Sequence, residues 1–538
     1  MKVYDAVAQI LKDEGIEHLV CYPRQALIDA CAAIGIRPIV CRQERVGVGI
    51  ADGITRSTYG RKTGVFSMQG GPGVENTFPG AAQVYGDNVP VLIIPGDRVG
   101  RSFTPPSFDP VQVFKPVTKW SAELNDPGRT LEIMRRAFHA LRTGKPGPVL
   151  IELQSPVGKQ EMPGEYAYTK AVRMRAGPDP QDVRRVAELL LSSKSPIVHA
   201  GQGVLYAGAT KELVRLAELL QAPVLTTNTG KGAFPENHPL SLGACVVSAP
   251  KMAFHWIKKA DVILGMGTSF TRNHWAPQIP NGKRIIHCTN DPSDIAKEFP
   301  TEAALLGDAK LVLQALIDEV GAKKRTSENV AAEVAAMKKE WLGEFAGELR
   351  SAEVPINQYR IVHDLMHAVD RENTIVTHES GSPREQMVAF WECITPGGYL
   401  GWGKTTQLGH GLGAIMGAKL ANPTKLCINI MGDASIGMVG MDIETAVRNK
   451  LGILTIVFNN GVMAGEQNGL LEAVQRYGAA DLTGNYAMVA KGLGAWSKRL
   501  DNADQFLPAL HEALEATTSG MPAVIECVAK QNFRYSRY

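Results

Sequence analysis

Acidic and amide side chains follow two apolar segments in the last third of the chain. The segment 428–431 runs into Gly432 and Asp433, and the segment 453–458 runs into Asn459 and Asn460. Asp433 and Asn460 are 27 positions apart, which leaves room for one crossover helix, predicted at 439–449, and a return strand parallel to the first. We therefore expect both polar groups at the carboxyl ends of adjacent strands, where open α/β sheets bind ligands.

These groups favour a magnesium site. The carboxylate of Asp433, the amide oxygen of Asn460 and the loop carbonyl of Val462 are hard oxygen donors. Mg²⁺ prefers such donors and keeps water and phosphate oxygens in its remaining octahedral positions. Taken alone, the pattern is also that of an ordinary βα turn beside a polar strand end.

The same segment resembles the diphosphate-binding motif of thiamine diphosphate enzymes. Gly432-Asp433-Ala434 is followed after 24 residues by Asn459-Asn460, and Ala434 stands where that family usually has glycine. The resemblance implies that Asp433, Asn460 and Val462 hold Mg²⁺. It also implies cofactor contacts from Gly432, Ala434, Ser435, Asn460, Val462 and Met463.

The preceding segment, WGKTTQLGHGLGAIMGA at 402–418, resembles the acetolactate synthase branch of that family. In that branch a large apolar side chain lies 25 residues before the metal-binding aspartate and holds the cofactor in a V shape; here this position is Leu408. Such a wedge would keep the reacting atoms of the cofactor together. A leucine in an ordinary core is the alternative. By resemblance, the other cofactor contacts are Thr406, Ser380, Gly381 and Ser382.

A glutamate in the first third carries the predicted proton chemistry. The segments QERVGVGIADG at 43–53 and QGGPGVEN at 69–76 resemble the pyrimidine-binding domain of the same enzymes. They place Glu44 on the glutamate that hydrogen-bonds the pyrimidine N1′, which implies a catalytic role in activating the cofactor. A buried, apolar setting would raise the pKa of Glu44 and keep its proton available near neutral pH. The structural alternative is a glutamate that interacts with a helix dipole.

Three segments depart from the acetolactate synthase pattern. Residues 21–24 read CYPR where the branch has a Gly-x-Pro-Gly turn, and residues 105–109 read PPSFD where it has Phe-Gln-Glu. After Asn460 the chain runs GVMAGEQ, without the tryptophan that helps acetolactate synthases to select 2-ketobutyrate. The sequence therefore predicts cofactor handling but not the biosynthetic substrate.

For several other polar residues the sequence allows two roles, a structural one or contact with the substrate. They are Arg24, His378, Glu379, Ser380, His410 and Glu466. The basic, aromatic tail at 530–538 either caps the site, grips an anionic substrate such as a CoA ester, or is a solvated chain end.

The elements that must position these residues alternate between short apolar strands and amphipathic helices, which is typical of parallel βαβ units. We predict an α/β protein with three Rossmann-like, doubly wound parallel-sheet domains: 1–165 (pyrimidine-binding), 180–330 (central) and 351–538 (diphosphate-binding). The predicted strands are 19–22, 38–41, 64–68, 89–95 and 148–153; 196–200, 223–227, 261–265 and 284–288; and 374–377, 425–431, 454–459 and 523–528. We expect a linker at 162–180 and a charged bridging helix at 329–350.

The sequence leaves the ligand of the central domain undecided. Some relatives hold FAD or ADP there, but the patterns that begin at Gly201 and Gly265 both lack the third glycine of a dinucleotide fingerprint. We therefore do not predict a bound flavin, and the incomplete patterns also disfavour a nicotinamide oxidoreductase.

Composition excludes several classes of protein. Of 538 residues, 44% are apolar and 21% charged, and the net charge is +3 without a basic block, which argues against disorder and nucleic-acid binding. No apolar run is long enough for a membrane span. The eight cysteines form no CxxC pair and indicate free thiols rather than disulfides or a zinc site. We expect a cytoplasmic protein with neither nucleic-acid nor membrane partners.

Together the motifs predict a thiamine diphosphate- and Mg²⁺-dependent lyase or transferase of the acetolactate synthase-like or pyruvate oxidase group. It would act on a 2-oxo acid by decarboxylation, acyloin formation (carboligation) or both. The alternative is a 2-hydroxyacyl-CoA lyase or an oxalyl-CoA decarboxylase-like enzyme. The resemblance also implies a homodimer or homotetramer in which the first domain of one subunit and the third domain of its partner enclose each cofactor.

Overall fold

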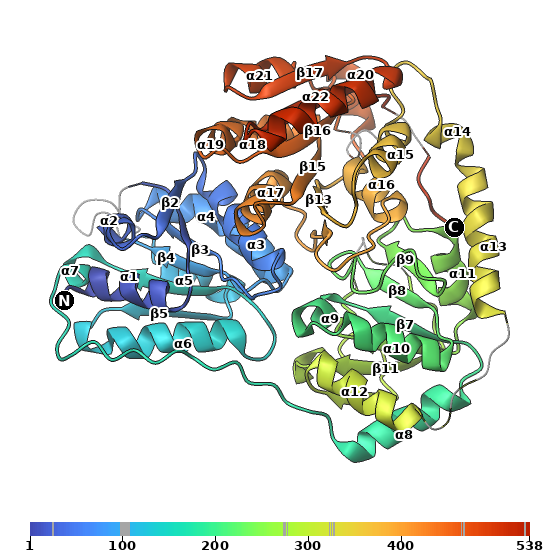
Figure 1. The fold of residues 1–538 in the computed structure, drawn as a ribbon, viewed down its shortest axis with the longest axis horizontal. Coiled ribbons are helices and arrows are strands. Elements are labelled where there is room, and N and C mark those ends of the chain that lie inside the picture. Colours follow the sequence, from blue (N-terminus) through green and yellow to red (C-terminus); the bar gives the residue numbers. More distant parts are fainter. Residues whose placement is uncertain are drawn as a thin grey trace.

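Three six-stranded sheets organise the chain (Figure 1). The computed structural model describes residues 1–23, 26–96, 108–272, 276, 278–321, 323, 325, 329–463, 465, 469–531 and 534–538. The strand orders are β2-β1-β3-β4-β6-β5, β12-β11-β10-β7-β8-β9 and β14-β13-β15-β16-β18-β17, with all pairs parallel. The predicted fold class, three doubly wound α/β units, is confirmed.

The first sheet has helices on both faces, with α1 and α6 on one side and α3 and α4 on the other (Figure 1). Covering both faces explains why its inner strands are apolar along most of their length. Its strands are β1 His18–Cys21, β2 Arg37–Val40, β3 Val65–Met68, β4 Leu92–Pro95, β5 Trp120–Leu124 and β6 Val149–Leu153. Its helices are α1 Val3–Asp13, α2 Ala26–Ala33, α3 Glu44–Arg56, α4 Pro72–Gly86, α5 Pro110–Phe114, α6 Thr130–Arg142 and α7 Ser155–Gly158.

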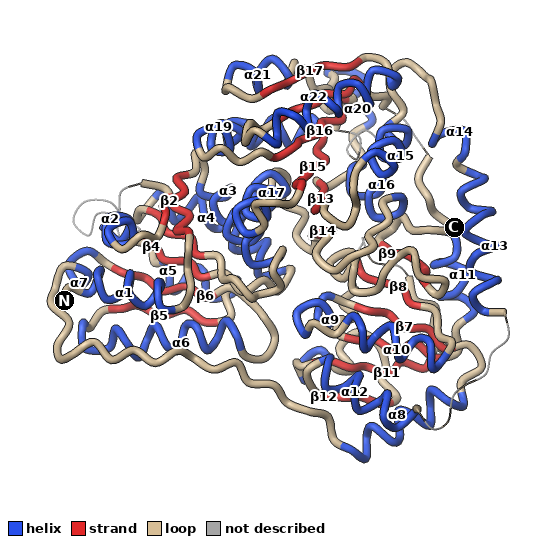
Figure 2. The backbone as a smooth tube through the Cα atoms, in the orientation of Figure 1, coloured by secondary structure: helices blue, strands red, loops and turns tan. Residues whose placement is uncertain are grey.

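The second sheet is reached through residues 163–179, a long loop without helix or strand (Figure 2). Its strands are β7 Pro196–Ala200, β8 Val224–Thr227, β9 Ser241–Cys245, β10 Val262–Met266, β11 Arg284–Thr289 and β12 Ala303–Leu306. Its helices are α8 Pro180–Ser192, α9 Gln202–Ala207, α10 Thr210–Leu220, α11 Lys251–Lys259 and α12 Ala309–Val320. The bridging helix predicted at 329–350 is two helices, α13 Val330–Glu344 and α14 Ala346–Leu349.

The third sheet carries the predicted diphosphate-binding residues. Its strands are β13 Thr374–His378, β14 Tyr399–Leu400, β15 Leu426–Gly432, β16 Ile453–Asn459, β17 Trp496–Leu500 and β18 Ala523–Val528. Its helices are α15 Gln358–Ala368, α16 Ser382–Phe390, α17 His410–Ala421, α18 Asp433–Val439, α19 Ile443–Arg448, α20 Leu471–Tyr477, α21 Tyr486–Gly492 and α22 Phe506–Thr518.

The single crossover helix predicted at 439–449 is wrong in detail. The connection is α18, a 3-10 turn at Gly440–Asp442, and α19. The carboxylate of Asp442 accepts hydrogen bonds from the backbone N–H of Arg42 at 2.8 Å and from the hydroxyl of Thr445 at 2.9 Å. The break in the helix is therefore fixed by a contact with the first domain.

Helices α3 and α17 join the first and third domains (Figure 1). They approach so closely that glycine is required where they cross. A Cβ at Gly53 would lie 1.9 Å from the carbonyl oxygen of Ala414, and one at Gly417 would lie 1.9 Å from the carbonyl oxygen of Ile50. The glycine-rich segments on which the family resemblance rests thus build the contact between these two domains.

The strands that the sequence did not predict are β5, β9, β12, β14 and β17, and each lies at an edge of its sheet. All eight cysteines are buried and free, as predicted. Within the described part of the chain, no helix has both the length and the apolar character needed to cross a bilayer. The three domain bounds remain predictions.

Candidate active site

The carboxyl ends of three neighbouring strands bring the predicted metal and diphosphate residues together. β15 pairs with β13 on one side and with β16 on the other. Ser380 lies after β13, Asp433 follows β15 and Asn460 follows β16, so the three turns open at one edge of the sheet. The spacing of Asp433 and Asn460 predicted this arrangement.

Asp433 contacts the turn after β16 directly. One carboxylate oxygen accepts a hydrogen bond from the N–H of Gly461 at 2.7 Å, and the other accepts one from the N–H of Ala434 at 2.8 Å. The amide oxygen of Asn460 accepts from the N–H of Val462 at 3.2 Å, which folds this side chain over the same turn. Burial raises the pKa of Asp433, and the N–H groups around it act in the opposite direction. A cation beside this carboxylate would offset the cost of burying it.

This donor set fits a magnesium ion, because carboxylate, amide and backbone oxygens are its usual ligands. No cluster of three or more His, Cys, Asp or Glu side chains suited to a metal occurs among the described residues, so a metal here depends on the mixed oxygen set. A Cβ at Gly432 or at Gly381 would meet no atom within 4 Å. The two turns therefore have open space beside their backbone, so a ligand such as a diphosphate group can approach it.

The other residues expected to contact the cofactor lie around the same edge. Gly381, at φ +85°, precedes α16, which begins at Ser382. Ala434 and Ser435 lie in the first turn of α18, where the hydroxyl of Ser435 donates to the carbonyl of Gly432 at 2.8 Å. The N–H of Met463 donates to the carbonyl of Ala480 at 2.8 Å.

Glu44 begins α3 and is 5% exposed. Its carboxylate accepts a hydrogen bond from the side chain of Asn76 at 3.3 Å. Burial raises the pKa of Glu44, while hydrogen bonds from its own N–H and from Asn76 act in the opposite direction. Glu44 thus lies in a buried setting, which is the condition under which the sequence analysis expects a raised pKa.

The neighbours of Glu44 reach the third domain of the same chain. The side-chain amide of Gln43 donates to the carbonyl of Met438 at 3.2 Å, and the guanidinium of Arg45 donates to the carbonyl of Leu408. The turn at Glu44 therefore lies against α18 and against the loop 401–409 that contains Leu408, here called the Leu408 loop. These contacts join the first and third domains of one chain, whereas the resemblance implies that the two domains enclosing a cofactor come from different subunits.

Glu379 binds the C-terminal end of the Leu408 loop through hydrogen bonds. It is fully buried after β13, and its two carboxylate oxygens accept from the N–H of Gly409 at 2.9 Å and from the N–H of Gly411 at 2.8 Å. Burial raises its pKa to about 8, against the opposing effect of these N–H groups and of Arg45. The sequence singled out Glu379 but did not predict that it binds this loop.

The two candidate histidines have structural partners. His378 stacks on Trp402 with ring centres 5.4 Å apart, and burial lowers its pKa to about 3. The ring of His410 lies 2.7 Å from the carboxylate of Asp52, which also pairs with Arg56. These contacts favour structural roles for both. Arg24, Glu466 and residues 105–107 of the altered segment lie outside the described residues.

The C-terminal tail packs away from the candidate site. The hydroxyl of Tyr538 donates to Glu344 at 2.6 Å, and the hydroxyl of Ser536 accepts from the indole of Trp341 at 2.8 Å. Residues 534–538 therefore lie along α13, which argues against a cap over the Leu408 loop. Residues 532–533 lie outside the described part of the chain.

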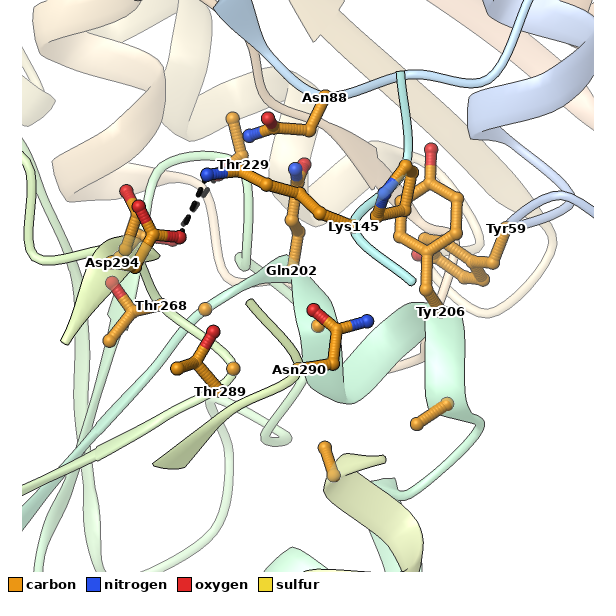
Figure 3. A pocket seen from close by; sticks show the side chains of 18 of the residues that line it. Tyr59, Asn88, Lys145, Gln202, Tyr206, Thr229, Thr268, Thr289, Asn290 and Asp294 are labelled. Atoms are coloured by element: carbon orange, nitrogen blue, oxygen red, sulfur yellow. Dashed lines mark hydrogen bonds and ion pairs between the residues drawn. The ribbon is translucent and has the colours of Figure 1, made fainter. Parts of the chain in front are cut away.

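The central domain has a cavity of about 220 Å³ at the carboxyl ends of its strands. Figure 3 shows side chains of the first domain, Tyr59, Asn88 and Lys145, on one side of it, with an ion pair of 2.8 Å between Lys145 and Asp294. The glycines of the two incomplete fingerprints pack on each other here, because a Cβ at Gly203 would lie 2.8 Å from the Cα of Gly267. They have a packing role whatever the cavity holds.

Sequence reasoning missed most of the side chains that hold the site together. They are Asn76 and Gln83 on α4, Asp87 directly after the end of α4, and Arg45 on α3. Gln83 and Asp87 are four positions apart, and this spacing gives no chemical signal in the sequence alone. Their partners lie more than 300 positions away in the loop before α17.

Comparison with known proteins gives the family. The domain descriptions "Thiamine pyrophosphate enzyme, N-terminal TPP binding domain", "central domain" and "C-terminal TPP binding domain" match residues 1–107, 183–316 and 379–527. The chain is 30% identical to a probable acetolactate synthase large subunit of Methanocaldococcus jannaschii, over 96% of this chain and 90% of that protein. It is 25% identical to the acetolactate synthase isozyme 3 large subunit of Escherichia coli, over 95% of this chain and 92% of that protein.

A solved structure shows the same fold. The crystal structure of benzoylformate decarboxylase from Polynucleobacter necessarius superimposes with a TM-score of 0.83, over 99% of both chains, at 22% identity. The three domain matches and the full-length relatives agree with the Glu44, Leu408 and Asp433 motifs. The chain therefore belongs to the thiamine diphosphate-dependent enzymes, in their acetolactate synthase-like group.

Proposed function

We propose that the protein is a thiamine diphosphate- and Mg²⁺-dependent lyase or transferase that breaks or forms the carbon–carbon bond beside the carbonyl of a 2-oxo acid. The observation that carries the proposal is the meeting of three motifs in one chain. The turn at Glu44 contacts the Leu408 loop and α18, and α18 begins at Asp433. These elements bring a proton donor, a rigid apolar side chain and hard oxygen donors close to one another.

Each residue has a defined task in this proposal. Asp433, Asn460 and the carbonyl of Val462 would hold Mg²⁺, whose charge neutralises the diphosphate. The turn at Ser380–Gly381–Ser382, together with Gly432, Ala434, Ser435, Thr406 and Met463, would contact the cofactor. Bound thiamine diphosphate would supply a carbon nucleophile for the 2-oxo group and an acceptor for the electrons left by CO₂.

Glu44 and Leu408 would prepare the reaction. Burial raises the pKa of Glu44, which favours the protonated carboxyl that would donate to the pyrimidine N1′. Leu408 is held by Arg45 at its carbonyl, while Glu379 holds the next N–H, so its position is fixed before any substrate arrives.

The substrate is best identified from products. Purified protein with Mg²⁺ and thiamine diphosphate is incubated with pyruvate, with and without an acceptor aldehyde, and the products are assigned by NMR. We expect acetaldehyde, acetolactate or a mixed acyloin. Benzoylformate is added as a second donor, because the structural neighbour is named as its decarboxylase. The altered segments at 21–24 and 105–109 favour a donor or acceptor other than that of the biosynthetic acetolactate synthases.

The cavity of the central domain supports a second candidate, an enzyme that acts on a CoA ester. Its place at the carboxyl ends of parallel strands suits a nucleotide. Titration with ADP and with FAD, followed by calorimetry, tests this. Tight ADP binding without turnover of any 2-oxo acid would favour the CoA ester and contradict the main proposal.

We also propose a homodimer or homotetramer in the cytoplasm. Large apolar side chains on α18 and α20 support association, since Met438 is 44% exposed, Leu471 63% and Tyr477 81%. The eight free, buried thiols suit a reducing compartment.

A further inference from the structure

The loop before α17 contains a residue in an unfavourable backbone conformation. Thr406 has φ +55°, in the left-handed region, which a β-branched side chain adopts only under constraint. Such strain persists where surrounding contacts over-determine the backbone, and it concentrates at functional sites. Thr406 is two positions from Leu408 and is itself one of the residues expected to contact the cofactor.

One side chain binds the residues on both sides of Thr406. The amide oxygen of Gln83 accepts from the hydroxyl of Thr405 at 2.6 Å and from the backbone N–H of Gln407 at 3.1 Å. The amide nitrogen of Gln83 donates to the carboxylate of Asp87 at 2.6 Å, which fixes which way the amide faces. Gln83 itself is 0% exposed, and its two hydrogen bonds to the loop are partly buried.

Asp87 binds the part of the same loop that precedes Thr405. Its carboxylate accepts from the N–H groups of Gly403 and Lys404, each at 3.2 Å, and pairs with Arg56 at 3.2 Å. The loop is thus bound on both sides of Thr406. Among the described residues, no hydrogen bond involves the backbone N–H or the backbone carbonyl of Thr406. Its backbone groups are left for another partner.

We propose that Gln83 is a positioning residue that holds Thr406 in its left-handed conformation and so presents the backbone of Thr406 to the cofactor. This inference rests on the proposed function, because it takes thiamine diphosphate as the ligand of the loop. Gln83 acts through Thr405 and Gln407 and does not itself contact the cofactor.

The test is a double-mutant cycle. Gln83→Met keeps the volume of the side chain but removes both hydrogen bonds to the loop. We expect the Kd for thiamine diphosphate, measured by calorimetry with saturating Mg²⁺, to rise about tenfold. Glycine adopts φ above zero without strain, so in the Thr406→Gly background Gln83→Met should change the Kd by less than about twofold. An equal rise in both backgrounds, or no rise in either, would overturn the proposal.

A second readout does not need bound cofactor. In the apoprotein, the amide proton of Gln407 should exchange with solvent about tenfold faster in Gln83→Met than in the wild type. Unchanged exchange contradicts the proposal even if cofactor affinity falls. Failure of the wild type to bind thiamine diphosphate would instead refute the proposed function, while the exchange rate would still decide whether Gln83 holds the loop.

Two further variants separate positioning from folding. Thr405 is exposed, so Thr405→Val should fold normally and still remove one of the two bonds, with a rise in Kd of about threefold. If Gln83→Met fails to fold, this variant carries the test, and an unchanged Kd counts against the proposal. Gln358→Met is the matched control, because Gln358 is also a fully buried helical glutamine but lies on α15. It should leave the Kd unchanged, and a comparable rise would show that the Gln83 effect is not specific to the loop.

Discussion

Asp433 supplies the negative charge of the proposed magnesium site. Its carboxylate is 3% exposed, and both of its oxygens already bind backbone N–H groups of the two turns. An amide of the same shape can keep part of this bonding without the charge. The substitution Asp433→Asn therefore separates the fold of the turn from its affinity for a cation.

We predict that Asp433→Asn folds normally but binds thiamine diphosphate at least about 100-fold more weakly at a fixed Mg²⁺ concentration, since loss of even a supporting group costs metal sites 10- to 100-fold. Calorimetric titration with and without Mg²⁺ measures this. Asp501→Asn, at an exposed position, is the control and should change nothing. An unaltered Mg²⁺ requirement in Asp433→Asn would rule out this residue as a ligand.

The residues proposed to contact the cofactor were easier to identify from the sequence than the residues that hold them in place. Asp433, Asn460, Leu408 and Glu44 stand at spacings that carry chemical meaning in the sequence. Glu379 was visible as a polar group after a strand, but its bonds to Gly409 and Gly411 depend on the tertiary fold. Sequence spacing reflects local geometry and does not show which residues meet when they are far apart in the chain.

At the scale of elements, the crossing of α3 and α17 sets the distance between the Glu44 turn and the Leu408 loop. A methyl group at Gly53 would overlap the carbonyl of Ala414, which is backbone and cannot turn aside. We predict that Gly53→Ala lowers the free energy of unfolding by about 3 kcal/mol or more. Urea denaturation measures this change.

The control for Gly53 is Gly343→Ala on α13, where a Cβ would meet nothing within 4 Å. There the change should stabilise the protein by up to about 1 kcal/mol, because alanine favours a helix over glycine. If Gly53→Ala were as stable as Gly343→Ala, the close packing of α3 on α17 would be refuted.

Because Glu379 binds the Leu408 loop and has a raised pKa, its contribution to the stability of the fold depends on pH. Its pKa is raised from the ordinary value of 4.5 to about 8 in the folded chain. Between these two values the folded state holds a proton that the unfolded state releases, so this contribution to stability is full below about pH 4.5 and is lost as pH rises to about 8.

We predict that the stability of the wild type relative to Glu379→Gln falls between about pH 5 and pH 8 and is constant above, since glutamine does not titrate. Urea midpoints of both proteins across this range give the difference. A difference that is flat, or that grows with pH, would contradict the raised pKa.

Three of the five strands that were not predicted, β5, β14 and β17, share one physical cause; β9 (SLGAC) and β12 (AALL) are edge strands that it does not explain. Each edge strand has a neighbour on one side only, so it needs fewer apolar residues than an inner strand. β5 reads WSAEL and β17 reads WSKRL, both with polar residues in the middle, and β14 has two residues. The inner strands are apolar along most of their length, and they are the ones that carry the site.

At the scale of the whole molecule, we predict a stable dimer or tetramer in light scattering coupled to size-exclusion chromatography. The exposed Met438, Leu471 and Tyr477 would be covered in such an assembly. Leu471→Lys with Tyr477→Lys should weaken it, whereas Val172→Lys, at an exposed apolar residue of the loop 163–179, should not. A mass equal to one chain at all concentrations would exclude a site shared between subunits.

The central claim is that Glu44 activates a thiamine diphosphate held at the Asp433 turn. The most direct test is the rate at which the C2 proton of the bound cofactor exchanges for deuterium, measured by NMR in the wild type and in Glu44→Gln. We predict that the variant binds the cofactor but exchanges this proton at a rate that is lower by a factor of about 100 or more, because it lacks a positioned proton donor. Equal rates in the two proteins, with the cofactor bound in both, would contradict the account.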